Sequence, residues 1–132
     1  MKINHGMKID TKKLAPIVLF VYNRPSHTLK VLEALNKAHY SETSILFIFS
    51  DGAKEKENLK KIDKVRSILK KKKWCEKVIV EEHKHNLGLA KNIKYGISKI
   101  LKSYSKVIVL EDDTVVSKSF LKYCNEALNL YE

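Results

Sequence analysis

The sequence predicts an α/β domain with a parallel, Rossmann-like sheet that carries helices on both faces. Three observations support this fold class. Short unbroken apolar runs, typical of strands buried on both faces, recur along the chain. Between them lie longer segments with apolar residues at helical spacing, and this alternation is typical of parallel sheets. Polar residues follow each apolar run directly, at the strand ends where such sheets bind ligands.

Each expected strand is followed by an expected helix. The strands are predicted at residues 16–22, 45–49, 77–80 and 107–110. The helices are predicted from a cap at Ser26 to about Ala38, within 54–73, after the Asn86-Leu87-Gly88 turn, and after a cap at Ser117. The residues expected to face the sheet are Val31, Leu35 and Ala38; Leu59, Ile62, Val65, Ile68 and Leu69; Ala90, Ile93, Ile97, Ile100 and Leu101; and Phe120, Cys124, Ala127 or Leu128, and Tyr131.

Length and composition suit one intracellular domain. A chain of 132 residues, 44% of them hydrophobic, can bury a real core. Residues 1–14 are expected to be a flexible tail, and residues 15–132 the domain. The first residues lack the apolar core of a signal peptide, and the longest apolar run is too short to cross a bilayer. Cys75 and Cys124 lack metal-ligand spacing and indicate a reduced pair, so we expect a cytoplasmic location.

The formal charge of +11 suits polyanionic partners: nucleic acid, anionic lipid or a diphosphate-bearing substrate. Residues 54–73 carry ten basic side chains against three acidic ones, on the outer face of an amphipathic helix. A solvated helix face explains them most simply, and peripheral contact with the anionic inner face of a membrane is the alternative. We expect no nucleic-acid partner, because Trp74 is the only aromatic residue beside the lysines.

The most informative stretch is KVIVLEDD, in which four apolar residues run into Glu111, Asp112 and Asp113. Carboxylates are costly to bury unpaired, so these should face solvent, a cation or a ligand. Oxygen ligands of this kind suit Mg²⁺ or Mn²⁺, which bind one or two carboxylates and complete their shell with phosphate and water. An acidic loop after a core strand is the alternative. His83 and His85 lack the partners of a tetrahedral metal site, and we expect surface histidines.

The other polar candidates each have a functional and a structural interpretation. Arg24 could pair with a diphosphate or stack on a base, or form a salt bridge with a neighbouring carboxylate. Asp51 could accept a hydrogen bond from a base N–H, or end its strand in an Asp-Gly turn. Asn86 and Gly88 could touch a ligand, or form a turn before the following helix.

Together these segments resemble the donor-binding half of a GT-A glycosyltransferase, especially the family 2-like bacterial enzymes and N-acetylglucosaminyltransferase I. The matching segments are APIVLFVYNRP, FSDG, NLGLAKN and VIVLEDDTVVSKSFLKY, in the family's order and spacing from residue 15 onward. The resemblance implies a nucleotide-diphosphate sugar donor, usually UDP-linked. It also implies transfer of a hexosyl or N-acetylhexosaminyl group to a glycan or lipid-linked acceptor.

The resemblance further implies where the nucleotide lies. Asn23 and Arg24 would stand at the nucleotide pocket, and Asp51 would face the pyrimidine base. Asn86 and Lys91 belong to the third loop, where Lys91 replaces the arginine of many family members as a phosphate contact.

The acid cluster corresponds to the family's DXD-like motif. By resemblance, Glu111 would lie near the donor sugar, Asp112 would contact the ribose or sugar, and Asp113 would hold Mn²⁺ or Mg²⁺ on the diphosphate. The family's acceptor region and base follow this motif, whereas this sequence ends at Glu132. We therefore expect a truncated relative with no catalytic residue of its own, inactive by itself.

Other functions fit the same plan less well. A sugar nucleotidyltransferase would need a glycine-rich loop after the first strand, and NRPSH contains no glycine. A phosphoacceptor receiver domain would need acids there, where Asn23 and Arg24 stand. A basic nucleic-acid-binding or interaction domain without catalysis is the non-enzymatic alternative.

Overall fold

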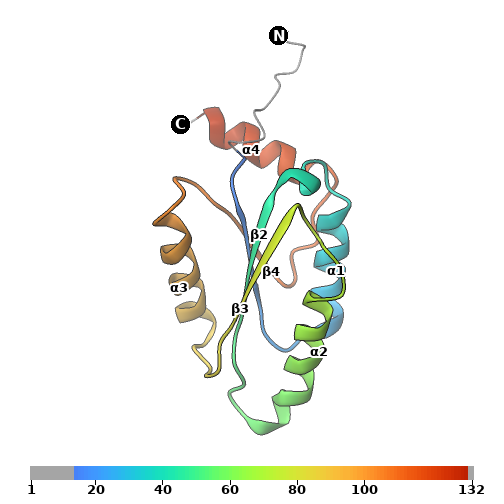
Figure 1. The fold of residues 1–132 in the computed structure, drawn as a ribbon, viewed down its shortest axis with the longest axis vertical. Coiled ribbons are helices and arrows are strands. Elements are labelled where there is room, and N and C mark those ends of the chain that lie inside the picture. Colours follow the sequence, from blue (N-terminus) through green and yellow to red (C-terminus); the bar gives the residue numbers. More distant parts are fainter. Residues whose placement is uncertain (1–13, 131–132) are drawn as a thin grey trace.

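The computed structural model describes residues 14–130, and it shows an α/β fold built on one sheet (Figure 1). The strands are β1 (Ile17–Val21), β2 (Ile45–Ser50), β3 (Lys77–Glu82) and β4 (Ile108–Glu111). Their order in the sheet is β3-β2-β1-β4, and all neighbours are parallel. The predicted fold class is confirmed, and the first and fourth strands are adjacent.

Helices cover the sheet on both faces (Figure 1). One apolar cluster joins the sheet to α1, α2 and α4, and a second joins its other face to α3. The helices are α1 (Pro25–Asn36), α2 (Leu59–Leu69), α3 (Leu89–Leu101) and α4 (Phe120–Leu130), with short 3-10 helices η2 (Ser41–Thr43) and η3 (Lys56–Asn58). None of the helices within residues 14–130 is both long and apolar enough to cross a bilayer.

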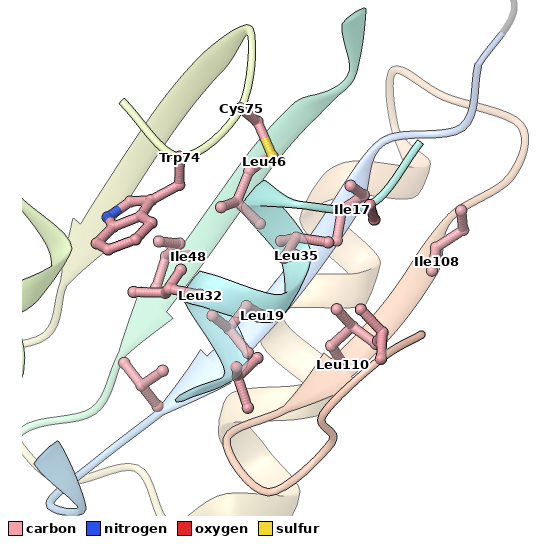
Figure 2. Packing of buried hydrophobic residues seen from close by; sticks show 14 of the residues in the cluster. Ile17, Leu19, Leu32, Leu35, Leu46, Ile48, Trp74, Cys75, Ile108 and Leu110 are labelled. Carbon is pink, nitrogen blue, oxygen red and sulfur yellow. The ribbon is translucent and has the colours of Figure 1, made fainter. Parts of the chain in front are cut away.

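The larger cluster holds the centre of the fold together (Figure 2). Leu19 of β1 and Leu32 and Leu35 of α1 are fully buried in it. Trp74 closes one side, with its indole nitrogen donating to the Leu69 carbonyl at 3.1 Å. Burying such side chains contributes roughly 1.5–3 kcal/mol each, so this cluster anchors the strand ends that form the site.

Helix α1 begins at Pro25 rather than behind a cap at Ser26. Proline suits the first helical position because its φ is already helical and its missing N–H would have no partner there. Arg24 is the capping residue, and its carbonyl accepts hydrogen bonds from the backbone N–H and the hydroxyl of Thr28, at 2.9 and 2.8 Å. The helix therefore starts directly at the sheet edge and places Arg24 there.

Several residues expected to be buried face outward. Leu59 and Leu101 stand at the ends of their helices and are 51% and 47% exposed. Ala90 is exposed because α3 presents a different stripe to the sheet, with Asn92, Gly96 and Ile100 as its buried residues. On β4, alternate residues are exposed, Val109 among them, since this edge strand is covered on one face only.

Some predictions fall on other parts of the chain. The predicted tail lies outside the described residues except for Leu14, and so does Tyr131.

Both cysteines are free thiols: Cys75 is buried and Cys124 is half-buried. Burial raises the pKa of the Cys75 thiol to about 12, so Cys75 packs as an apolar residue.

Candidate functional site

A pocket of about 350 Å³ opens at the carboxyl ends of the strands. β1 lies between β2 and β4, so the chain turns to opposite sides of β1 at this point, and such switch points are where parallel sheets bind ligands. The pocket is lined by residues from the ends of β1 and β4, the segment after β2, and the start of α3: Phe20, Val21, Tyr22, Asn23, Arg24, Asp51, Lys54, Asn86, Gly88, Leu89, Asn92, Glu111 and Asp112.

Most of the predicted site residues come together here. The pocket is bordered by Asn23, Arg24, Asp51, Asn86, Glu111 and Asp112. Lys91 and Asp113 are exposed and do not border it: Lys91 lies on the first turn of α3, and Asp113 lies just past β4.

Sequence reasoning missed six lining residues, among them Phe20 and Val21, which were assigned only to the first strand. Leu89 and Asn92 belong to the NLGLAKN segment, which marked the right place without distinguishing its members. Tyr22 adjoins the predicted Asn23 and was assigned only to the strand. Lys54 was hidden in the lysine-rich run.

Asp51 organises one end of the pocket. Its Oδ1 accepts hydrogen bonds from the backbone N–H groups of Gly52 and Leu87, at 2.9 and 2.8 Å. Its Oδ2 accepts from the Gly88 N–H and the Asn86 amide, at 3.0 and 3.2 Å. A carboxylate offers about four acceptor positions, so all of them are used. This geometry favours the structural interpretation of Asp51, as the residue that holds the 86–88 loop.

Two glycines let the backbone come close at this end. A Cβ on Gly52 would lie 2.7–2.9 Å from backbone atoms of His83 and His85, so only glycine fits without displacement. Gly88 has a φ of +83°, in the region that L-residues rarely adopt. The tight packing leaves little freedom to the loop.

Arg66 braces the same end from α2. Its Nε donates to the Ser50 hydroxyl at 2.9 Å, and its Nη2 donates to the carbonyls of Ser50, Asp51 and His83 at 3.2, 3.1 and 2.9 Å. The side chain is only 20% exposed. Although Arg66 belongs to the basic run, it points inward and joins the ends of β2 and β3.

His83 is not the surface residue that we expected. Its side chain is 12% exposed, because the chain leaves β3 beneath α3. The ring stacks on Phe49 at 6.5 Å between centroids and meets Tyr95 edge-on at 5.3 Å. Its Nε2 lies 3.0 Å from the Asn92 amide oxygen. His85, in contrast, is exposed as predicted.

At the other end of the pocket, Arg24 and Asp112 form a salt bridge through two nitrogens and both carboxylate oxygens, with Nε to Oδ2 at 3.3 Å. Asp112 is nearly buried, whereas the Arg24 side chain is 46% exposed. Hydrogen bonding to Asp112 and its charge raise the pKa of Arg24, with smaller contributions from Asp113 and Glu111. The salt-bridge interpretation of Arg24 therefore holds in this structure.

The acid cluster fits a metal ion that takes one or two carboxylates from the protein and its other ligands from a bound diphosphate and water. Within residues 14–130 no group of three or more His, Cys, Asp or Glu side chains could enclose an ion. Mg²⁺ beside a diphosphate needs only one or two protein carboxylates. In the described chain, the exposed Asp113 and Glu111 side chains make no hydrogen bond or salt bridge, whereas the Asp112 carboxylate is committed to Arg24. The donor chemistry therefore suits a metal held by Asp113, with Glu111 beside it.

Fold and site together define an α/β domain with a pocket at the carboxyl edge of a parallel sheet, between a hydrogen-bonded loop and an acid cluster. The chain belongs to glycosyl transferase family 2, whose family model matches residues 17–130. That span contains all four strands, all four helices and every lining residue of the pocket. Membership confirms the resemblance to the N-terminal half of a GT-A glycosyltransferase. No curated protein matches the chain.

Proposed function

We propose that this domain binds the donor of a metal-dependent glycosyltransferase, a UDP-linked sugar. The observation that carries the proposal is the division of one pocket into two chemically different ends. Apolar and aromatic side chains line one part of it, and an arginine with Glu111 and Asp112 lines another, with Asp113 just outside. A nucleoside diphosphate has the same division, between a flat base and a charged diphosphate.

The base end is formed by Phe20, Tyr22 and Leu89, next to the loop that Asp51 holds. The Asn86 amide nitrogen donates to Asp51 and to the Gly52 carbonyl, which leaves its amide oxygen as an acceptor for a ligand. The family resemblance assigns the base contact to Asp51. To contact the base directly, Asp51 would have to give up one of its four hydrogen bonds. We therefore propose that Asp51 acts chiefly by holding the 86–88 loop in place beside the base.

The diphosphate end brings cations and acids together. Arg24 borders the pocket and supplies positive charge, while Asp113, with Glu111 beside it, would hold Mn²⁺ or Mg²⁺. The metal, when bound, acts as a Lewis acid that stabilises the charge of the departing diphosphate. The phosphate contact of Lys91 stays a prediction.

Two further parts of the proposal are supported by the resemblance alone. We propose that the transferred group is a hexosyl or N-acetylhexosaminyl residue, and that the acceptor is a glycan or a lipid-linked molecule. A sugar nucleotidyltransferase is disfavoured by the match to a glycosyltransferase family over residues 17–130. Contact of the exposed lysines of α2 with an anionic membrane, and a cytoplasmic location, stay predictions.

A thermal-shift titration with UDP, with and without Mn²⁺, tests the proposal. At 100 times Kd, ligand binding should stabilise the fold by about 2.7 kcal/mol, and only when the metal is present. Asp113→Asn keeps the shape of the side chain and removes its charge, so it should abolish the metal-dependent shift. Asp63→Asn is the matched control, because Asp63 is an exposed aspartate on α2 away from the pocket.

Two results would contradict the proposal in different ways. A wild-type chain without any UDP-dependent shift in Mn²⁺ would remove the support for donor binding. A metal-dependent shift that survives Asp113→Asn, and equals that of Asp63→Asn, would place the metal at other ligands.

A further inference from the structure

Asn92 is a buried amide that borders the pocket. It lies on the first turn of α3 and is 2% exposed. Its amide oxygen faces His83 Nε2, whereas its amide nitrogen has no partner among the described residues. Every fully buried side-chain nitrogen or oxygen in the described chain does have a partner, so this nitrogen reaches open space. The space that Asn92 lines is the pocket.

The orientation of this amide is held by its surroundings. His83 is fixed between Phe49 and Tyr95 by ring contacts, and its Nε2 lies 3.0 Å from the Asn92 oxygen. Because an amide oxygen only accepts hydrogen bonds, His83 is the donor of this pair. With the oxygen held by His83, the nitrogen is turned to the other side. The backbone of Asn92 is fixed as well, since its N–H donates to the Gly88 carbonyl at 2.9 Å.

The other polar groups near the base end are already engaged. Asp51 uses all four acceptor positions on the loop, and the Asn86 amide nitrogen donates to Asp51 and Gly52. The Asn23 amide nitrogen donates to Asn58 at 2.8 Å. Among the amide side chains that line the pocket, Asn92 is therefore the one whose amide nitrogen makes no hydrogen bond to any described residue.

We infer that Asn92 determines base specificity in this pocket, by donating a hydrogen bond from its amide nitrogen to a carbonyl oxygen of the base. This inference rests on the proposed function, because it requires a nucleotide at the end formed by Phe20 and Leu89. Uracil carries two carbonyl oxygens and suits such a donor. A buried donor left unpaired is costly, so a base that presents no acceptor at this point should bind less well.

The experiment measures Kd values for UDP, 2-thio-UDP and 4-thio-UDP in the presence of Mn²⁺. Sulfur is a poorer acceptor than oxygen, so the wild-type chain should bind one thio analogue about threefold to tenfold more weakly than UDP. Asn92→Ala should weaken UDP binding by a similar factor. It should have little further effect on that thio analogue, because the same hydrogen bond is already lost.

Two control variants separate ligand contact from structure. Asn125→Ala deletes an equally buried asparagine on α4, which binds the Ala15 N–H and the Leu121 carbonyl away from the pocket. It should lower stability and leave the Kd for UDP unchanged. His83→Phe keeps a ring beside Phe49 and removes the hydrogen bond to Asn92, so its loss of UDP affinity should be smaller than that of Asn92→Ala.

The outcomes are distinguishable from a failure of the proposed function. Suppose that the wild-type chain binds UDP. If Asn92→Ala then binds UDP with the same Kd, or if it raises the Kd values of UDP and both thio analogues by the same factor, this inference is wrong and donor binding stands. If the wild-type chain does not bind UDP, both fail. Should Asn92→Ala not fold, equal wild-type affinities for UDP and the two thio analogues would overturn the inference without any variant.

Discussion

The two ends of the pocket handle negative charge in opposite ways. At the closed end, formed by Asp51, Gly52 and the 86–88 loop, one carboxylate is 3% exposed and receives four hydrogen bonds. At the open end, formed by Arg24 and residues 111–113, only Asp112 pairs with the arginine, and the Glu111 and Asp113 side chains are exposed without a hydrogen bond or salt bridge to any described residue. At the closed end, the protein itself uses every acceptor position of the carboxylate. At the open end, the carboxylates of Glu111 and Asp113 remain available as acceptors.

This difference indicates that the two ends contribute to binding in different ways. A buried carboxylate must be satisfied by the protein itself, so the closed end is rigid before any ligand arrives. An exposed carboxylate loses little by remaining unpaired in water, so the open end can keep its ligands for a cation. We therefore expect substitutions at the closed end to change stability, and substitutions at the open end to change binding.

The same substitution at both ends gives the largest expected contrast. Asp51→Asn should lower the free energy of unfolding by about 2–4 kcal/mol, because an amide accepts fewer hydrogen bonds and turns its own N–H toward loop donors. Asp113→Asn should change it by less than about 0.5 kcal/mol, and any change should be stabilising, since it relieves repulsion with Glu111 and Asp112. Urea denaturation of the two variants measures both values, and equal losses would refute the distinction between the ends.

Gly52 tests how tightly the closed end is packed. Gly52→Ala places a methyl group within 2.7–2.9 Å of the backbone at His83 and His85, and should cost about 1–3 kcal/mol of stability. Gly88→Ala is the control: it meets no atom within 4 Å but keeps a positive φ, so it should cost about 1 kcal/mol. A Gly52→Ala chain as stable as the wild type would show that the strand ends are loosely held.

Arg66 and Arg24 are the chain's two arginines, one at each end. Arg66→Lys should cost about 1–2 kcal/mol, because an ammonium cannot reach the Ser50 hydroxyl and three carbonyls from one planar group. The loss should also weaken UDP binding, since the Asp51 carbonyl is one of the acceptors. Denaturation and UDP titration of one variant check both effects, and a loss of UDP affinity without a loss of stability would contradict a bracing role.

The fold and much of the site could be predicted from the sequence because both depend on local patterns. Unbroken apolar runs indicated the four strands, and polar residues after each run indicated the pocket edge. Arg24 and Asp112 were expected at one edge of the sheet because each follows a strand of a parallel sheet, and they meet there. Each of these inferences needs only the period of a segment and the parallel direction of the strands.

What could not be predicted depends on contacts between distant segments. The bonds from Asp51 to Leu87 and Gly88 span 36 and 37 residues, and nothing in an Asp-Gly pair distinguishes them from an ordinary turn. Arg66 looks like any other member of a lysine-rich helix face until the helix is placed on the sheet. The exposure of Val109 follows from the edge position of β4, which is a property of the whole sheet.

The last prediction concerns the ion pair at the open end, where the expected loss of stability is smaller than at Asp51, Gly52 or Arg66. Arg24→Lys keeps the charge and loses the bidentate contact with Asp112. It should lower the free energy of unfolding by less than about 1 kcal/mol, because the arginine is 46% exposed and solvent weakens the attraction. Denaturation at about 0.05 and about 0.5 M salt should show the difference between wild type and variant shrinking as salt rises, since the Debye length falls. The hydrogen bonds of Arg66 to uncharged acceptors are much less sensitive to salt. A loss at Arg24 that equals the loss at Arg66, and that does not respond to salt, would mean that the open end is built as rigidly as the closed one.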